Sequence, residues 1–501
     1  MLASFPRPAG YLWLQKHYQI KVPRHHVESH VIEGNRRTVV APGFTEEFYP
    51  KTYWPGEEDF DHLEFALRRE GFHLALLRRL LPRLGDERMT AYVRSKPTGA
   101  YARRLWFLYE AFTGHHLEID DLSQGNYISL LDEEEYCVGF PERSKRHRIN
   151  VNLLGRIDFT PMVRRTEKLR AGEEKRLDER CRQVLSEIPP ELYQRAIHYL
   201  YAKETKSSYD IEREKPDQIR ANRFAELLKE AAKTDYLEQD ALVTLQNSIV
   251  DPRYANKGWR DTIREQNYVG RSLGGGGEEI HFIPPRPSEI APLMADFLNA
   301  SKHLLASTAN PVAVAAAIAY PFVFLHPFTD GNGRIHRFLI HYVLSRLGFA
   351  PEGIVFPVSA IMLHDPKAYD ASLEAFSRRL VPRIDYELDA WGKMTVREDT
   401  ADFYRYIDCT AMAEALFDFV ERTIEEELPT EITYLRRYDE ARRKMREIVD
   451  MPNTDADLFI RFCRQNNGRL GNAKQHRYEK LTTEEISRLE TVIREIFENG
   501  G

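Results

Sequence analysis

An apolar segment that runs into a glycine-containing loop restricts the fold of this chain more than any other feature. Residues 311–325 form a 15-residue apolar stretch, rich in alanine and interrupted by Pro321. A membrane-spanning helix needs about 20 apolar residues, so this stretch is too short to cross a bilayer. Alanine lets neighbouring helices approach closely. We therefore expect a helix buried in the core of a soluble protein that has no membrane partner.

The loop that follows this helix has the sequence HPFTDGNGRIHR, residues 326–337. Gly331 and Gly333 allow backbone conformations that are barred to other residues, so successive N–H groups can turn to one side. Such a cluster of N–H groups at the start of a helix binds phosphate oxygens, helped by the helix dipole. The loop therefore predicts a phosphate-binding site.

Charged side chains surround this predicted phosphate site. Arg334 and Arg337 are three residues apart, so they share one face of the first helical turn and can clamp further phosphates. Asp330 is the only carboxylate in the loop, and its natural partner beside a phosphate is Mg²⁺. A neutral imidazole at His326 would take the proton from an incoming hydroxyl while the clamp holds the phosphate chain in line.

The loop resembles the signature of the Fic (Fido) family, HxFx(D/E)GNGRxxR, and matches all eight specified positions. Over residues 241–395 the resemblance implies a mainly α fold, in which a Fic-type helical core carries a β-hairpin flap. It also implies transfer of AMP from ATP to a Ser, Thr or Tyr hydroxyl of a target protein, with release of pyrophosphate. The resemblance implies that His326 is the general base and that Asp330 is the Mg²⁺ ligand. It also implies an anion hole formed by Gly331, Asn332 and Gly333, and a phosphate clamp formed by Arg334 and Arg337.

A short alternating segment, EIHFI, lies between a run of glycines and two prolines. It resembles the family's flap, which pairs with an extended segment of the target through backbone hydrogen bonds and so makes little demand on the target sequence. A plain surface hairpin is the alternative interpretation. The predicted target-binding residues are Glu279, Ile280, His281, Phe282 and Ile283.

Many Fic proteins also share an inhibitory helix with the pattern (S/T)xxxE(G/N), and two segments of this chain resemble it. Residues 29–34 match in full, whereas residues 208–213 depart from the pattern at Arg213. We favour the second segment, and hence Glu212, because it lies in a helix-forming region just before the core. Glu33 stands among β-branched residues beside a Gly-Asn pair, which is typical of a strand entering a turn.

The resemblance implies what the inhibitory glutamate does. It pairs with the second arginine of the motif, here Arg337, and blocks the site of the γ-phosphate. We therefore expect an ion pair between Glu212 and Arg337 that competes with the triphosphate. The departure at Arg213 leaves the tightness of this inhibition open.

The length of 501 residues suits several domains. We expect a mixed α/β region of unknown role over 1–150 and a helical region with the candidate inhibitory helix over 151–240. The Fic core would follow over 241–395, and a helical region over 396–501. Within the second region, dense mixed charge over 166–182 predicts one exposed helix.

Composition narrows the class of protein further. The formal charge of −6 argues against a general nucleic-acid binder, so the basic cluster RSKRHR, residues 143–148, is read as a solvated loop, with a nucleic-acid contact as the alternative. Four distant cysteines without a CxxC motif suit the reducing cytoplasm, and the N-terminus does not resemble a secretory signal. The sequence leaves open whether the chain forms a homo-oligomer.

Alternative functions at the same site are the transfer of another nucleotide and the removal of AMP from a modified protein. A further alternative is a nucleotide-sensing regulatory module without transferase activity. We prefer a transferase, because a histidine base is superfluous for binding alone.

Overall fold

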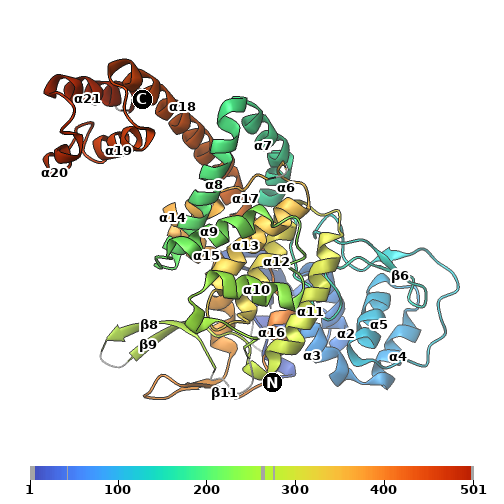
Figure 1. Cartoon of the computed structure of the whole chain (residues 1–501). Helices are drawn as coiled ribbons and strands as arrows, with labels where there is room; N and C mark the ends of the chain where they lie inside the picture. Colours follow the sequence, from blue (N-terminus) through green and yellow to red (C-terminus); the bar gives the residue numbers. More distant parts are fainter. Residues whose placement is uncertain (1–5, 42, 261–265, 275–276, 352, 498–501) are drawn as a thin grey trace.

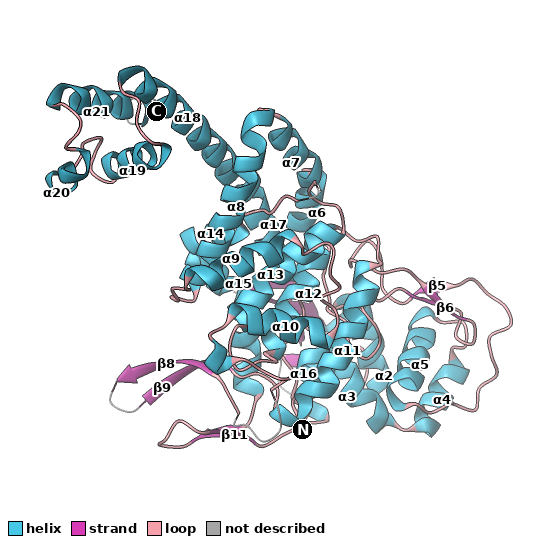
Figure 2. Cartoon of the chain, viewed as in Figure 1, coloured by secondary structure: helices cyan, strands magenta, loops and turns pink. Residues whose placement is uncertain are grey.

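A computed structural model describes residues 6–41, 43–260, 266–274, 277–351 and 353–497 of the chain. The structure is mainly helical, as expected, and the described strands form four small sheets (Figures 1 and 2).

The N-terminal region packs helices against two of these sheets, and it is mixed α/β as expected. In the larger sheet the strand order is β1-β2-β4-β3, with β2 and β4 parallel and the other pairs antiparallel. The smaller sheet has the order β5-β7-β6. The strands are β1 (Arg7–Ala9), β2 (Val27–Ile32), β3 (Arg37–Ala41), β4 (Phe44–Pro50), β5 (Ile128–Ser129), β6 (Glu142–Ser144) and β7 (Ile149–Val151). The helices are α1 (Gly10–His17), α2 (Asp59–Arg69), α3 (Leu74–Leu84), α4 (Asp86–Ser95) and α5 (Ala100–Thr113).

The central helices share one hydrophobic core, whose members run from Cys137 to Leu435. At its centre lies α12 (Pro311–Leu325), almost wholly buried and with the predicted bounds. Asn310 caps its start, since the side chain accepts a hydrogen bond from the Val312 N–H. The other helices are α6 (Glu167–Glu174), α7 (Leu177–Ser186), α8 (Pro190–Ile211), α9 (Gln218–Lys229), α10 (Gln239–Ile249), α11 (Pro287–Leu305), α13 (Asn332–Arg346), α14 (Val358–His364), α15 (Pro366–Leu380), α16 (Ala401–Arg405) and α17 (Thr410–Arg422).

Two antiparallel hairpins project from the same side of this core (Figure 1). The first, β8 (Val269–Gly274) and β9 (Gly277–Phe282), contains the predicted flap segment. The second consists of β10 (Tyr386–Leu388) and β11 (Met394–Val396). Two of the residues predicted to meet the target, Phe282 and Ile283, are instead buried in the core and anchor the base of the flap.

The C-terminal helices are α18 (Leu428–Ile448), α19 (Asn453–Arg464), α20 (Asn472–Gln475) and α21 (Thr483–Phe497). The long α18 carries the last three away from the central core, and they enclose a small core of their own (Figure 1). The division of the chain at residues 150, 240 and 395 stays a prediction.

The prediction of one exposed helix over 166–182 is wrong. The chain forms α6 and α7, separated at Arg176, whose φ of +47° is left-handed. Arg182 and Asp178 form an i,i+4 pair along α7 at 3.0 Å, but other charges join separate helices: Lys168 and Lys175 pair with Asp418 at 2.6 Å and Glu421 at 2.5 Å. Sequence spacing detects pairs along one helix but not pairs across two helices.

The second half of the basic cluster at residues 143–148 is neither a solvated loop nor an exposed nucleic-acid contact. Arg146 pairs with Glu110 at 2.9 Å and Asp121 at 2.7 Å, and the Arg148 guanidinium donates to the carbonyl of Leu122 at 3.0 Å. His147 is buried between them. These cations hold the loop against α5, an arrangement that depends on residues distant in the sequence.

Among the described residues, every helix is too short or too polar to span a membrane. The four cysteines are buried and unpaired.

Candidate active site

His326 stands at the end of α12, where the backbone turns out of the helix. Its φ of +51° is left-handed, and its Nδ1 lies 3.3 Å from the Val323 carbonyl oxygen. The side chain lines a cavity of about 300 Å³ between the flap, the end of α12 and α15. Burial, with a smaller contribution from the charge of Arg260, lowers the pKa of His326 to about 4. The imidazole is therefore neutral at pH 7, as a general base must be.

The loop after His326 is held in shape by Asn332. The Asn332 side chain accepts from the Phe328 N–H at 3.0 Å and donates to the Phe328 carbonyl at 2.9 Å, while Phe328 itself is buried. Gly331 caps α13 with a φ of +90°, and a Cβ at this position would lie 2.8 Å from a methyl carbon of Val250. Both the conformation and the space thus require glycine, and the first N–H groups of α13 follow directly.

Two residues that the sequence did not single out support this loop from behind. The Gln246 side chain donates to the Asp330 carbonyl at 3.1 Å. The backbone N–H of Arg260 donates to the Pro327 carbonyl at 2.6 Å, and its guanidinium donates to the Pro285 carbonyl at 3.0 Å, where the chain leaves the flap. Burial lowers the pKa of Arg260 to about 10. Arg260 therefore connects the flap to the loop that carries His326.

The two motif arginines are buried, with 1% of the Arg337 side chain and 2% of the Arg334 side chain exposed. Arg337 Nη2 lies 2.8 Å from Glu212 Oε1 and 2.8 Å from the Ser208 carbonyl oxygen. The structure thus places Glu212 on Arg337. Glu33, the alternative candidate, lies exposed just after β2 in the N-terminal sheet.

Glu212 also covers the predicted anion hole. A Cβ built on Gly333 would collide with the Glu212 carboxylate, so this carboxylate lies directly against the start of α13. A phosphate group that approached the same N–H groups would meet a negative charge and would have to displace it.

The backbone conformation at the end of α8 explains why the inhibitory pattern has Gly or Asn directly after its glutamate, here Glu212. The N–H of Glu214 bonds the Tyr209 carbonyl at 3.1 Å, and the N–H of Arg213 bonds the Asp210 carbonyl at 3.0 Å. These two bonds make a Schellman motif, which requires a left-handed residue at position 213, and Arg213 has a φ of +55°. Glycine adopts this conformation without strain, whereas arginine does not.

Replacing Arg213 by glycine is therefore expected to stabilise the folded protein by about 1 kcal/mol, because the left-handed strain is relieved. Thermal unfolding would show a higher Tm, and the more rigid helix end would hold Glu212 more firmly. Arg213→Ala is the matched control, because it removes the same side chain but keeps the strain. An equal Tm for both variants would contradict this account.

A second glutamate, which the sequence analysis missed, occupies the other motif arginine. Glu214 Oε2 lies 2.5 Å from Arg334 Nη1, and its Oε1 lies 2.6 Å from Arg220 on α9. Arg334 also donates to both Asp330 oxygens, at 2.9 and 3.0 Å. The only sequence signal was the alternation of glutamate in IERE, residues 211–214. Glu212 and Glu214 thus neutralise both clamp arginines.

Asp330, the predicted Mg²⁺ ligand, is partly exposed, and both of its carboxylate oxygens accept from Arg334. Its side chain is 40% exposed and it borders the first N–H groups of α13. Mg²⁺ in phosphate sites commonly takes one or two carboxylates together with substrate oxygens. Within the described ranges no three His, Cys, Asp or Glu side chains converge as a metal site, so such an ion would depend on the phosphates.

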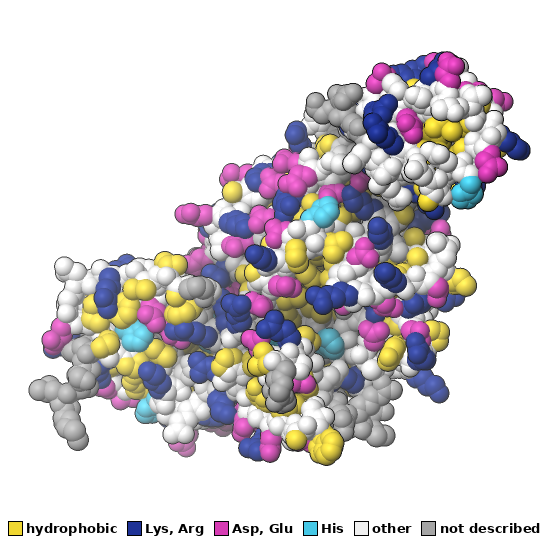
Figure 3. All heavy atoms as spheres, turned by 90° about the vertical axis from the view of Figure 1, so that its left-hand side faces the viewer, with side chains coloured by type: hydrophobic (Ala, Val, Ile, Leu, Met, Phe, Trp, Pro, Cys, Tyr) yellow, Lys and Arg dark blue, Asp and Glu magenta, His cyan; other side chains and the backbone are white. Residues whose placement is uncertain are grey.

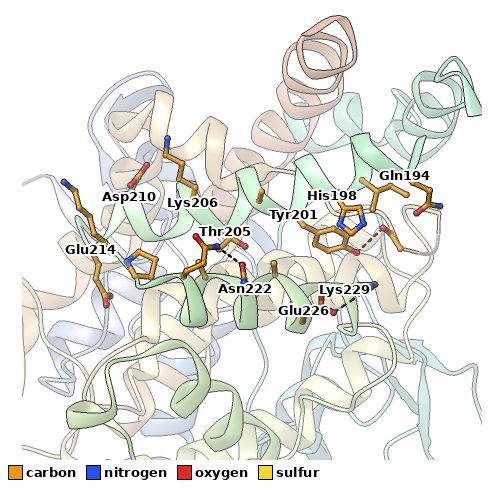
Figure 4. A pocket seen from close by; sticks show the side chains of 18 of the residues that line it. Gln194, His198, Tyr201, Thr205, Lys206, Asp210, Glu214, Asn222, Glu226 and Lys229 are labelled. Carbon is orange, nitrogen blue, oxygen red and sulfur yellow. Dashed lines mark hydrogen bonds and ion pairs between the residues drawn. The ribbon is translucent and has the colours of Figure 1, made fainter. Parts of the chain in front are cut away.

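The segment with the two glutamates is also reachable from outside the active site. Asp210 and Glu214 line an open groove of about 890 Å³ between α8 and α9 (Figure 4). Lys206, Thr205 and Asn222 lie along the same groove. Solvent therefore reaches the end of α8 through this groove, which His326 does not line.

Comparison with known proteins identifies one domain of the chain. The Fic/DOC family matches residues 236–344. Residues 236–344 are therefore identified as a Fic/DOC domain. The protein adenylyltransferase Fic of Drosophila erecta is 47% identical over 91 residues, which is 18% of this chain and 16% of that protein. The protein adenylyltransferase Fic of Culex quinquefasciatus is 43% identical over 72 residues, 14% of each.

The chain therefore matches these relatives over less than a fifth of their length. Among solved structures, a Fic family protein from Desulfovibrio desulfuricans has a TM-score of 0.38 at 16% identity. That alignment covers 60% of this chain and 87% of the other.

Proposed function

We propose that this Fic chain is a protein adenylyltransferase that moves AMP from ATP to a Ser, Thr or Tyr hydroxyl of a target protein. The observation that carries the proposal is a neutral His326 that lines a cavity between the flap, the end of α12 and α15, a few residues before the start of α13. A site for binding alone has no need of such a base, whereas hydroxyl transfer does. The match to adenylyltransferases supports AMP as the transferred group.

In the proposed reaction, the first N–H groups of α13 and the guanidinium groups of Arg334 and Arg337 bind the phosphate chain. The ring nitrogen of His326 that does not contact Val323 accepts the proton of the target hydroxyl. The hydroxyl oxygen then forms a bond to the α-phosphorus, the bond from that phosphorus to the bridging oxygen breaks, and pyrophosphate leaves. Mg²⁺ bound at Asp330 would neutralise charge on the phosphates.

The same proposal includes autoinhibition. Glu212 lies where the end of the triphosphate would bind, and Glu214 holds Arg334. ATP would therefore bind productively only when α8 releases both arginines. The target would present its hydroxyl on an extended segment beside the flap, where Glu279 and His281 are exposed and Ile280 is half-buried.

Mass spectrometry of the purified chain and of Glu212→Gly after incubation with ATP and Mg²⁺ tests the function. We expect a covalent AMP on a hydroxyl residue, with more of it on the variant. Parallel reactions with GTP, CTP and UTP test the alternative of another nucleotide. Nucleotide binding without any covalent product in the variant would contradict the proposed function and favour a sensor.

A further inference from the structure

The second hairpin, β10–β11, presents an unusually exposed tryptophan beside the flap. Trp391, at its tip, is 94% exposed, the most of any large hydrophobic side chain that the structure describes. A lone surface hydrophobic needs no explanation. However, of the ten exposed large hydrophobic side chains in the described part of the chain, three lie on the two projecting hairpins: Val269, Leu273 and Trp391.

The turn that carries Trp391 is fixed by its own hydrogen bonds. Asp389 Oδ1 accepts from the N–H groups of Trp391 at 2.9 Å and Lys393 at 2.8 Å. Gly392, with a φ of +79°, closes the turn through its N–H to the Asp389 carbonyl at 3.1 Å. The backbone that carries the indole is therefore fixed, so binding a partner at Trp391 costs little backbone entropy.

The two hairpins are connected at their base. Gln266, which precedes β8, forms an antiparallel bridge with Met394 of β11, and its side chain donates to the Pro284 carbonyl at 2.9 Å. Near the tip, a Cβ on Gly392 would lie 3.5 Å from the hydroxyl of Tyr268. The second hairpin thus keeps a definite position relative to the flap.

One of these three exposed side chains also borders the candidate active site. Val269, 46% exposed, lines the cavity that contains His326. Leu273, 59% exposed, lies further along β8, and Trp391 lies on the neighbouring hairpin. Both hairpins point the same way (Figure 2), and the face from which they project shows hydrophobic side chains between charged ones along its lower part (Figure 3).

The charged groups around this surface largely neutralise one another. Arg397 pairs with Glu387 at 2.5 Å, and Arg271 pairs with Glu279 at 3.6 Å. Attachment to an anionic membrane favours a surplus of basic side chains around the inserted residues, which this pairing does not provide. An apolar patch with a tryptophan at its edge, next to a catalytic cavity, instead fits a protein partner.

We propose that β10–β11 is a second target-binding element, in which Trp391 packs against an apolar side chain of the target protein beside the segment that pairs with the flap. This inference rests on the proposed transferase function. It deepens that function, because it makes the preferred substrate a protein with an apolar residue close to the modified hydroxyl. The flap's backbone bonds alone would accept many sequences.

The test compares labelling of other proteins with labelling of the chain itself. Glu212→Gly chains with and without Trp391→Ala receive α-labelled ATP, Mg²⁺ and a dialysed lysate of the source cells. We expect Trp391→Ala to lower labelling of lysate proteins about tenfold, which corresponds to about 1.4 kcal/mol of lost binding, and to leave self-labelling unchanged. Phe140→Ala, which removes another exposed aromatic ring, is the matched control and should change neither.

A photoreactive benzoylphenylalanine in place of Trp391 identifies the partner. We expect the protein cross-linked at this position to carry the AMP label. Equal lysate labelling with and without Trp391, or a parallel loss of self-labelling, would overturn the inference. Sedimentation with phosphatidylcholine–phosphatidylserine vesicles that depends on Trp391 would also overturn it. If the Glu212→Gly chain with Trp391 intact labels neither itself nor any lysate protein, the proposed transferase function fails as well. This result differs from a loss of labelling that depends on Trp391.

Discussion

Replacing His326 by alanine in a Glu212→Gly chain is expected to lower nucleotide transfer by about 10²- to 10⁴-fold, the usual contribution of a general base. The imidazole lines the cavity between the flap, the end of α12 and α15, and burial keeps it neutral. ATP binding should change little, because the N–H groups of α13 and the two arginines remain. Labelling rates together with ATP titration measure both quantities.

The pH dependence of the same reaction gives an independent test. His326 acts as a base only when it is unprotonated, and its pKa is lowered from its usual range to about 4. Protonation therefore removes activity only as the pH falls towards 4, and the rate of the Glu212→Gly variant should stay nearly constant between about pH 8 and pH 6. A fall centred near pH 6.5 would show that the histidine is not buried as described.

His364→Ala serves as the control for both measurements, since that histidine is exposed and lies outside the cavity. It should leave the rate and its pH dependence unchanged. Full transfer activity in His326→Ala would contradict the role of His326 and the mechanism built on it.

The second large expected effect is the rise in labelling rate when Glu212 and Glu214 no longer pair with the two motif arginines. Glu212→Gly should raise the labelling rate at low ATP by about tenfold or more, because a competing ion pair of about 1.4 kcal/mol lowers the apparent nucleotide affinity tenfold. Glu214→Gln alone should have a smaller effect, since Arg337 stays occupied. Arg334 then retains Asp330 and the Ile249 carbonyl as partners, so the protein should remain folded.

The double variant distinguishes one inhibitory contact from two. If both carboxylates compete with the phosphates, Glu212→Gly with Glu214→Gln should bind ATP more tightly than either single variant. Isothermal titration with ATP and Mg²⁺ measures this, with Glu226→Gln, an exposed residue of α9, as the control. An unchanged labelling rate in Glu212→Gly would contradict autoinhibition. An equal ATP affinity of the double variant and Glu212→Gly would show that Glu214 does not compete with the phosphates.

Residues 326–337 could be interpreted from the sequence because the whole constellation is contiguous. Backbone N–H groups, a histidine and two arginines at fixed spacing around a helix start meet whenever that local structure forms. The buried helix over 311–325 was equally local, since its apolar composition and its length determine where it lies. The spacing of the inhibitory motif likewise selected Glu212, although its match was incomplete at Arg213.

Tertiary packing decided which groups these local structures meet. Glu212 and Arg337 are 125 residues apart, and Glu214 and Arg334 are 120 apart, so no periodicity connects them. They meet because α8 packs with its C-terminal end over the start of α13. The same holds for the link from Arg260 to the flap, the internal use of the basic cluster at 143–148 and the position of Trp391 beside the flap. Local sequence determines backbone conformation and chemistry, whereas the long-range contacts that control access to the site depend on how the helices and hairpins pack together.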